Sequence, residues 1–449
     1  MLSQIMYNYT FIFVLYIFLS YNQFMNFKEH LCNSLPKEEV DQLIDSFSNE
    51  DYHAVLLNLN KISDEEFLKE FPLVKSHPIV KHAYLYDKNV YPLGKNIYHE
   101  LGYYYLQEPS AMVVSSLIDF KETDLVLDMC AAPGGKTIQA SLKMNNKGLV
   151  ISNDLSFSRC GLISNNLERL GLRNVIIINN DLSKIYHRYI NTFDKIILDA
   201  PCSGSGMFRK HDEMMDDWSI NKVYKNQEIQ KQLIDIAYQM LKPGGLLSYS
   251  TCSYSKEEDE DVVQYLLSKC DAELDDLSKF GYVNPNSQIG IRLMPSHFQG
   301  EGQYICQIRK PGNSSPTVFE QDNKFKALLA SSYQNSDVEK VNDFLFASTS
   351  SIKLPLMNIY RYGVKVGEFK KDIFKYDIHY ARTLKAGEMQ SVELSEDELK
   401  KYLVGEQLNK ATNFKGQVLL TYKNNAVDIA KSDTRVIKNN YPKGLRKKF

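Results

Sequence analysis

Two cysteines and one aspartate carry the chemistry that the sequence suggests most directly. Cys202 lies in the segment DAPCSG, which Asp199 opens, and Cys252 lies in the segment SYSTCS. Each segment directly follows a short apolar run. If the two runs are neighbouring parallel strands, both thiols and the carboxyl group converge at one edge of a sheet. A thiolate is a nucleophile, and a carboxyl group can exchange a proton or a hydrogen bond with a reacting ring.

Such a group of side chains suits the methylation of a pyrimidine at C5. That carbon is a poor nucleophile toward a methyl sulfonium group, but addition of a thiolate at C6 converts the ring to an enamine. For cytosine, N3 must be protonated or strongly hydrogen-bonded, which Asp199 can supply. A second thiol can assist the release of the first. The residues alone leave open which cysteine attacks. The alternative, that both are small buried core residues, is disfavoured by their position at adjacent strand ends.

A glycine turn and a series of acidic strand ends indicate a cofactor site. Asp128 is followed by MCAAPGGKT, in which small residues allow backbone N–H groups and a helix N-terminus to approach a ligand. The turn matches neither GxGxxG nor the phosphate-binding GxxxxGK[ST] pattern. Asp154 ends the next apolar run, where a carboxylate can accept hydrogen bonds from ribose hydroxyls, and Asp181 ends the third, positioned for an exocyclic amine. A single such aspartate is more often a helix cap, but the series favours S-adenosylmethionine over NAD or ATP.

The elements that must position these residues form an α/β pattern. Apolar runs at 125–130, 148–154, 175–181, 195–201 and 244–252 alternate with helical segments. This pattern predicts a doubly wound, mostly parallel Rossmann-like sheet. The preceding region predicts helices at 38–47 and 64–71 and a strand at 54–60. Beyond a linker at 311–316 we expect a helix at 323–333, another at 395–404 and a hairpin at 417–431.

The composition and the N-terminus bound the class of protein. With 449 residues, 43% hydrophobic and 24% charged, the chain is an ordinary globular protein of several domains. Its net charge of −2 means that any nucleic-acid surface must be local. The seven cysteines include no CxxC pair, so we expect reduced thiols, no metal and a cytoplasmic location. The apolar run at 10–20 is too short to span a bilayer, and we interpret residues 1–24 as a start assigned too early rather than an anchor.

Several other residues have two interpretations each. Ser255 and Glu258 have capping-box spacing, and the acidic run from Glu257 to Asp261 then reads as a first helical turn. Arg209 and Lys210 fit either an RNA backbone contact or a solvated loop. The three tyrosines at 103–105 fit either stacking on an unpaired base or core packing. Trp218 reads as a core residue.

Long motifs resemble one family. The segments DMCAAPGGKT, LDAPCSGSGMFRK, LKPGGLLSYSTCSYSKEEDE and RLMPSHFQGEGQYICQIRK are similar to the Nop/Sun family of S-adenosylmethionine-dependent RNA cytosine-C5 methyltransferases. YHELGYYYLQEPSAM and KNNYPKGLR resemble its RsmF-like branch. The resemblance implies cofactor contacts from Cys130, Ala131, Ala132, Pro133, Gly134, Gly135 and Lys136, and from Asp154, Asp181 and Asp199. It also implies that Cys252 is the nucleophile and that Cys202 assists product release.

The resemblance also implies a domain order and marks two departures. We expect an RNA-binding region at 25–110, a methyltransferase domain with a Rossmann-like sheet at 111–312, an RsmF-like domain at 313–390 and a PUA-like domain at 391–449. Leu56 stands where the family pattern usually has Arg, which removes one RNA contact. DIAKSD replaces a usual glycine and tryptophan, which points to a degenerate PUA-like domain. From Lys431 to Phe449 there are seven Lys or Arg residues and one Asp, which we interpret as a basic tail facing RNA.

The resemblance and the residues together lead to one expected function. The chain is expected to be a monomer that forms 5-methylcytosine in 16S ribosomal RNA and binds neither DNA nor a membrane. Alternatives are methylation of transfer RNA, which would use every one of the same residues, and a catalytically inert RNA-binding or ribosome-assembly factor. Because the target base must leave its stack to reach Cys252, an exposed or locally opened cytosine is expected.

Overall fold

The computed structural model describes residues 26–49, 52–210, 212–319, 337–349, 357–370 and 373–447, together with residues 329, 333, 352 and 355. Residues 1–24 and almost all of the helix expected at 323–333 lie outside the described residues. No helix among the described residues is long and apolar enough to cross a membrane.

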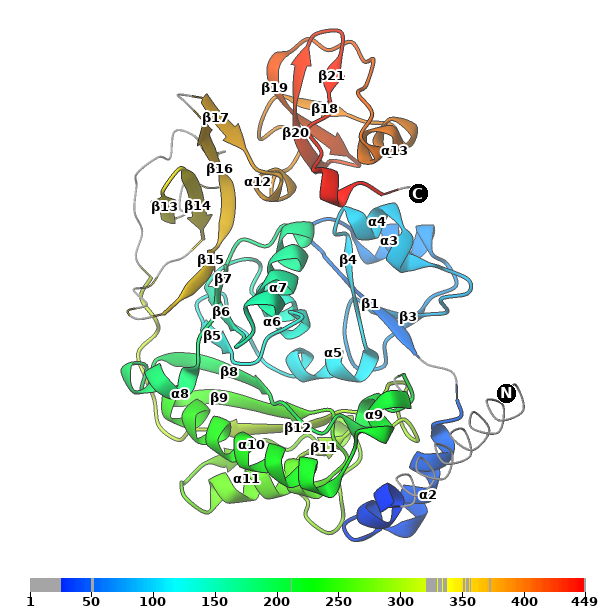
Figure 1. The fold of residues 1–449 in the computed structure, drawn as a ribbon, viewed down its shortest axis with the longest axis vertical. Coiled ribbons are helices and arrows are strands. Elements are labelled where there is room, and N and C mark those ends of the chain that lie inside the picture. Colours follow the sequence, from blue (N-terminus) through cyan, green and yellow to red (C-terminus); the bar gives the residue numbers. More distant parts are fainter. Residues whose placement is uncertain are drawn as a thin grey trace, which may run out of the picture.

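A mixed sheet forms the centre of the molecule and confirms the expected doubly wound α/β fold (Figure 1). Its order is β10-β12-β9-β8-β5-β6-β7-β15. The middle five strands are parallel: β5 (Leu125–Asp128), β6 (Leu149–Asn153), β7 (Val175–Ile178), β8 (Phe193–Asp199) and β9 (Leu241–Thr251). Antiparallel strands flank them: β10 (Glu273–Leu274), β12 (Tyr304–Arg309), with β11 (Ile291–Arg292) paired to it, and β15 (Ile359–Tyr362).

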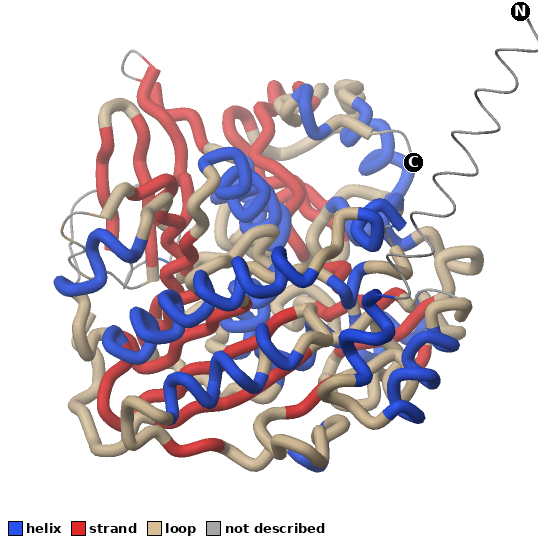
Figure 2. The backbone as a smooth tube through the Cα atoms, turned by 60° about the horizontal axis from the view of Figure 1, so that its bottom comes forward, coloured by secondary structure: helices blue, strands red, loops and turns tan. Residues whose placement is uncertain are grey.

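Helices cover both faces of this sheet, which explains why its strands are apolar on both sides. Leu125 and Leu127 pack on one face with α10 (Ile220–Met240) and α11 (Glu260–Leu267), whereas Val126 packs on the other with α6 (Gly135–Lys143) and α7 (Phe157–Leu170). Figure 2 brings the first of these faces forward and shows its helices lying along the strands. The sheet is therefore enclosed, and its ligands can approach only at the strand ends.

The region before the central sheet forms a second sheet of order β2-β3-β1-β4. Its strands are β1 (His53–Leu57), β2 (Lys75–Ser76), β3 (Ala83–Tyr86) and β4 (Tyr104–Gln107), and its helices are α2 (Lys37–Ser46), α3 (Asp64–Glu70), α4 (Ile97–Glu100) and α5 (Pro109–Ser116). The expected helices at 38–47 and 64–71 and the strand at 54–60 are confirmed, with α2 shifted by one residue, α3 one residue shorter and β1 ending at Leu57. A capping box of Ser63 and Glu66 starts α3.

The C-terminal part contains two further sheets. The first has the order β13-β14-β16-β17, formed by Asp337–Val341, Phe344–Ser348, Val364–Lys370 and Ile373–Tyr376, and α12 (Ile378–Arg382) follows it. The second has the order β18-β19-β20-β21, formed by Ser391–Glu393, Lys415–Tyr422, Asn425–Asp433 and Ile437–Lys438, with α13 (Glu396–Val404). The expected helix at 395–404 and the hairpin are confirmed, and the hairpin turns at Lys423 and Asn424, both left-handed.

The basic segment from Lys431 onward is not an appended tail, which corrects the sequence-based interpretation. Lys431 lies in β20 and pairs with Lys438 of β21, and the side chains of Ile437 and Tyr441 are buried in the core. Lys447 forms an ion pair of 2.9 Å with Glu100. The last described residues therefore belong to the folded C-terminal domain, and part of their charge is neutralised.

The tyrosines at 103–105 are core residues, which confirms core packing as the correct one of their two interpretations. All three side chains are almost fully buried. The hydroxyl group of Tyr103 donates to the carbonyl oxygen of Tyr422 at 3.0 Å, which joins the N-terminal sheet to the C-terminal domain. Trp218 is buried as expected, in a cluster with Phe27 and Phe208.

Candidate active site

The ends of β8 and β9 bring the two predicted cysteines together. These strands are parallel neighbours, with Asp199 opposite Ser250. Cys202 and Cys252 follow them, and their sulfur atoms lie 3.2 Å apart. Both thiols are free and partly exposed. The two side chains can therefore act on one substrate atom and its neighbour.

The backbone of the two cysteine loops is also in direct contact. The amide of Gly206 donates to the carbonyl oxygen of Cys252 at 2.6 Å. A Cβ atom at position 206 would lie 2.7 Å from that oxygen, so the approach requires glycine. The amide of Ala200 donates to the carbonyl oxygen of Ser250 at 2.8 Å. These bonds extend the pairing of β8 and β9 into the loops that carry the thiols.

Glu258 bridges both cysteine loops through the serine that follows each thiol. Its carboxylate accepts from the amide of Ser203 at 2.8 Å and from its hydroxyl group at 2.5 Å, and from the hydroxyl group of Ser253 at 2.6 Å. The amide group of Gln230 adds a donor at 3.2 Å. The carboxylate is fully buried, and burial raises its pKa although these donors oppose the shift. One buried side chain thus fixes both loops.

This arrangement corrects the interpretation of Ser255 and Glu258 as a capping box. Ser255 makes no side-chain cap, and its hydroxyl group is buried without a hydrogen-bond partner among the described residues. Glu260 and Asp261 of the acidic run lie in the first turn of α11, as expected, but Asp259 and Glu260 are also buried against partners. Asp259 accepts from the hydroxyl group of Thr251 at 2.6 Å, and both Asp259 and Glu260 pair with the buried guanidinium of Arg292. Because Thr251 precedes Cys252, this ion-pair network supports the same loop.

The surroundings of Cys202 keep its thiol protonated. The hydrogen bond to Cys252, burial and the nearby carboxylate of Glu258 raise the pKa of Cys202 well above its usual range. The Cys202 thiol can therefore donate a hydrogen bond to the sulfur atom of Cys252. A neighbouring donor of this kind stabilises a thiolate on its partner.

Asp199 lies between the cysteines and the predicted cofactor turn. Its carboxylate pairs with the ammonium group of Lys136 at 2.7 Å and accepts from Ser250 at 2.7 Å and Gln303 at 2.9 Å. Burial alone would lower the pKa of Lys136, but Asp199 outweighs it and the pKa is raised. About a third of the Asp199 side chain (32%) stays exposed, which leaves it accessible to a ligand.

The predicted cofactor turn leads from β5 into α6. Gly134 has a φ of +109° and caps α6, so the first N–H groups of this helix face the turn. Cys130, Ala131, Ala132 and Pro133 form the turn itself, and the amide of Ala131 donates to the carbonyl oxygen of Asn153 at 2.8 Å. Gly135 approaches Gln107 so closely that a Cβ atom at position 135 would lie 2.8 Å from the side-chain amide nitrogen of Gln107. Burial raises the pKa of Cys130, so this third thiol stays protonated.

The acidic residues around the turn have different environments. Asp154 is buried (3% of its side chain exposed), accepts from the amide of Ser156 at 2.9 Å and lies 3.3 Å from the amide of Ala132. Asp181 is more exposed: it caps the short helix α8 (Leu182–Ile185), accepts from the amide of Ser183 at 3.1 Å and pairs with Lys184 at 3.3 Å. Asp154 thus contacts the turn, whereas Asp181 contacts residues of α8.

The donors and acceptors around the turn fit S-adenosylmethionine. Asp128 accepts from Thr137 at 2.7 Å through one oxygen, and its other oxygen is buried without a partner among the described residues. Carboxylates at Asp128 and Asp154, a glycine approach and a helix N-terminus together offer acceptors to hydroxyl groups and donors to a carboxylate. No group of metal-ligating side chains occurs in the described part of the chain.

Arg209 is a buried structural residue, unlike either interpretation offered for it, whereas Lys210 stays partly exposed and its RNA contact remains a prediction. Arg209 is buried against Glu301 at 2.8 Å and donates to the carbonyl oxygen of Gly300 at 3.2 Å. Lys210 lies 3.4 Å from the same carboxylate. Phe208 is a core residue. This ion pair anchors the loop that follows Cys202.

Sequence reasoning missed three residues of this site: Glu258, Gln303 and Gly206. The spacing between Ser255 and Glu258 predicts a capping box, not a bridge between the cysteine loops. Gln303, which directly precedes β12, orients Asp199 from more than a hundred residues away along the chain. The glycines of SGSG next to Cys202 were a usable signal for Gly206, because a close backbone approach is a usual reason for glycine.

Comparisons with known proteins agree with this architecture. Three family models match: "N-terminal domain of 16S rRNA methyltransferase RsmF" at residues 25–109, "16S rRNA methyltransferase RsmB/F" at 115–309 and "Methyltransferase RsmF PUA domain" at 389–447. The "Ribosomal RNA small subunit methyltransferase F" of Vibrio vulnificus is 31% identical over 80% of this chain and 82% of its own length. The protein of the same name from Aliivibrio fischeri is 29% identical over the same shares.

Solved structures share the fold. A "Methyltransferase Homolog Protein" from Pyrococcus horikoshii is 31% identical with a TM-score of 0.54, over 62% of this chain and 92% of its own. "NSun6" from the same organism, solved "with SFG", is 23% identical with a TM-score of 0.58, over 64% of this chain and 98% of its own.

Replacing Glu258 by Ala should destabilise the protein, because it removes the acceptor of the buried amide and hydroxyl group of Ser203 and of the hydroxyl group of Ser253. We expect a loss of about 3 kcal/mol in the free energy of unfolding, measured by urea denaturation. Glu228→Ala is the control, since that exposed carboxylate pairs only with Lys231 and should matter by less than about 1 kcal/mol. Equal effects of the two substitutions would contradict the bridging role.

Asp128 should make stability depend on pH. Burial raises its pKa to about 7, above the unfolded value, so the folded state holds a proton that the unfolded state has lost. Its contribution is complete below about pH 4 and is lost as the pH rises toward 7. Unfolding free energies of the wild type and Asp128→Asn should therefore differ by an amount that changes between pH 4 and 7 and is constant above pH 8. A difference that does not vary with pH would refute the assignment.

Proposed function

The chain belongs to the RsmB/F family of 16S rRNA methyltransferases, and from that membership we propose that it methylates C5 of a cytosine in small-subunit ribosomal RNA. Its cofactor is S-adenosylmethionine, which supplies the methyl group. The observation that carries the proposal is the pair of sulfur atoms 3.2 Å apart at the ends of β8 and β9. A simple methyl transfer to a nucleophilic atom needs no thiol, whereas transfer to C5 needs one that adds to C6.

Cys252 is the nucleophile in this proposal. The thiol of Cys202 stays protonated and can hold the neighbouring sulfur as a thiolate, which is the attacking form. The sulfur of Cys252 bonds to C6, and the electrons of the C5–C6 double bond move toward C5 and N3. C5 thereby becomes nucleophilic enough to accept the methyl group.

Asp199 supports the ring during this addition. Lys136, Ser250 and Gln303 all donate to its carboxylate, whose oxygens therefore act as acceptors in the structure. Asp199 accepts a hydrogen bond from N3–H after N3 of the cytosine has taken a proton from water, instead of donating one as the sequence suggested. The negative carboxylate stabilises the protonated ring.

Cys202 assists the release of the product. After methyl transfer the C5 proton leaves to a base, the C5–C6 double bond re-forms and the bond between C6 and the Cys252 sulfur breaks. The departing sulfur carries the electron pair and accepts a hydrogen bond from the Cys202 thiol at the observed separation. This bond lowers the barrier to elimination.

RNA is the proposed partner, bound by a monomer through the region at 25–110 and the PUA-like domain. Lys431 and Lys438 form a basic pair on neighbouring strands of that domain, and neither makes an ion pair among the described residues. Phosphate groups are natural partners for such lysines.

The function is tested by incubating the protein with 16S rRNA, or with small ribosomal subunits, and S-adenosylmethionine carrying a labelled methyl group. After digestion to nucleosides, the label should appear in 5-methylcytidine. Label in another nucleoside, or none with folded protein that binds the RNA, would contradict the proposal.

Replacing the two cysteines should have different effects on adduct formation and on methylation. Cys202→Ala should form the bond to C6 but release it poorly, so a protein–RNA adduct accumulates and is seen as a mobility shift in a denaturing gel. Cys252→Ala should form no adduct and lose methylation by at least a hundredfold. Cys306→Ala, at a buried position on β12, is the matched control and should form no adduct. Methylation by the Cys252 variant would refute the assignment.

A further inference from the structure

A polar, aromatic hollow lies where β1 begins and β3 ends. It encloses about 510 Å³, and its lining includes Tyr52, His53, Leu73, Lys75, Tyr86 and Gln299. We call it the flanking pocket. His53 and Tyr86 are paired across the two strands, with ring centroids 5.6 Å apart. The volume is within the range of small-molecule sites.

The flanking pocket is connected to the loop that follows Cys202. The guanidinium of Arg209 lies 5.2 Å from the ring centroid of Tyr52. Arg209 in turn bonds to Gly300 and Glu301, which directly follow Gln299 of the pocket. Three residues before Arg209, Gly206 bonds to Cys252. Contacts through Tyr52, Arg209 and Gly206 therefore connect the flanking pocket to the loops that carry the reacting cysteines.

The lining has the chemistry of a nucleotide site. Aromatic faces at Tyr52 and Tyr86 can stack on a base, and Leu73, 70% exposed, adds an apolar surface. Lys75 is exposed and makes no ion pair among the residues that the structure describes. Lys75 can therefore offer a cation to a phosphate group, beside the carboxylate of Asp87 in the same lining. An anionic strand with stacking bases matches this combination better than an apolar ligand does.

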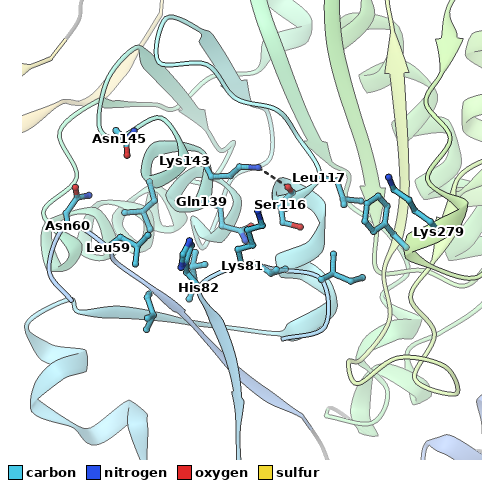
Figure 3. A pocket seen from close by; sticks show the side chains of 16 residues that line it. Leu59, Asn60, Lys81, His82, Ser116, Leu117, Gln139, Lys143, Asn145 and Lys279 are labelled. Atoms are coloured by element: carbon cyan, nitrogen blue, oxygen red, sulfur yellow. Dashed lines mark hydrogen bonds between the residues drawn. The ribbon is translucent and has the colours of Figure 1, made fainter. Parts of the chain in front are cut away.

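A larger cavity lies elsewhere in the molecule (Figure 3). It encloses about 780 Å³ beside the C-terminal end of α6, the opposite end from the cofactor turn. Its Lys143 points toward the end of α5 and donates to the carbonyl oxygens of Ser116 and Ile118, and its His82 pairs with Asp64. Lys81 and Lys279 line it as well, but its place at that end of α6 separates it from the cofactor turn and the cysteines.

We propose that the flanking pocket binds a nucleotide of the RNA strand next to the target cytosine, with its base on Tyr86 or Tyr52 and its phosphate near Lys75. The inference rests on the proposed function, since it identifies the substrate strand of that same site. Holding a neighbouring nucleotide helps to keep the target base out of its stack while Cys252 reacts.

The experiment measures RNA binding without catalysis. The probe is a fluorescein-labelled single-stranded RNA of fifteen nucleotides with one central cytidine, and all variants are made in the Cys252→Ala protein. Tyr86→Leu should weaken binding about fivefold or more, because a base loses its stacking surface. Lys75→Ala should reduce the slope of log K against log salt by roughly 0.7, the value for one phosphate of a single strand.

Two surface residues provide matched controls. Tyr224, half exposed on α10, is replaced by Leu, and Lys121, exposed before the amino end of β5, is replaced by Ala. Both should leave affinity and salt slope unchanged within twofold. Pocket variants that bind as the controls do would overturn the proposal, and Lys75→Ala keeps the test valid if Tyr86→Leu unfolds.

The outcome is independent of the proposed reaction. Loss of binding in the pocket variants, together with an absence of 5-methylcytidine from the wild-type reaction, would leave the pocket standing and the reaction refuted. Methylation by the wild type, with pocket variants that bind RNA normally, would refute the pocket alone.

Discussion

The buried carboxylate of Glu258 is the interaction on which the site depends. The two loops that carry Cys202 and Cys252 lie beyond the paired residues of β8 and β9, yet the reaction needs their thiols within contact distance. Glu258 bonds to the serine after each cysteine, and the amide of Gly206 joins the loops directly. The ion pairs of Arg292 with Asp259 and Glu260 support the loop of Cys252, because Thr251 donates to Asp259. A buried polar network therefore fixes the positions of the two thiols relative to each other.

Much of the fold and part of the site could be predicted from the sequence. Apolar runs that end in acidic or small residues imply a parallel sheet, and the sheet brings the ends of β8 and β9 together. The approach of Cys202 to Cys252 follows from this topology alone. The family resemblance added what spacing could not supply, namely which cysteine attacks.

The remaining features depended on contacts between distant parts of the chain. Glu258 has the spacing of a cap, but burial against Ser203 made it a bridge instead. The local sequence around Arg209 fits an RNA contact or a solvated loop, but Arg209 forms a buried ion pair with Glu301, which is distant along the chain. The basic segment after Lys431 looked like a tail because local sequence does not show that Ile437 and Tyr441 enter a core. In each case a local pattern was outweighed by a tertiary partner.

The proposed reaction depends most on a bond between the Cys252 sulfur and C6 of the target cytosine. RNA with 5-fluorocytidine tests it directly, because fluorine at C5 cannot leave as a proton and the adduct persists after methyl transfer. Mass spectrometry of peptides from the wild-type protein, treated with this RNA and S-adenosylmethionine, should find a methylated fluoropyrimidine on the peptide that contains Cys252. Attachment to the Cys202 peptide, or methylation with no adduct at any cysteine, would contradict the account.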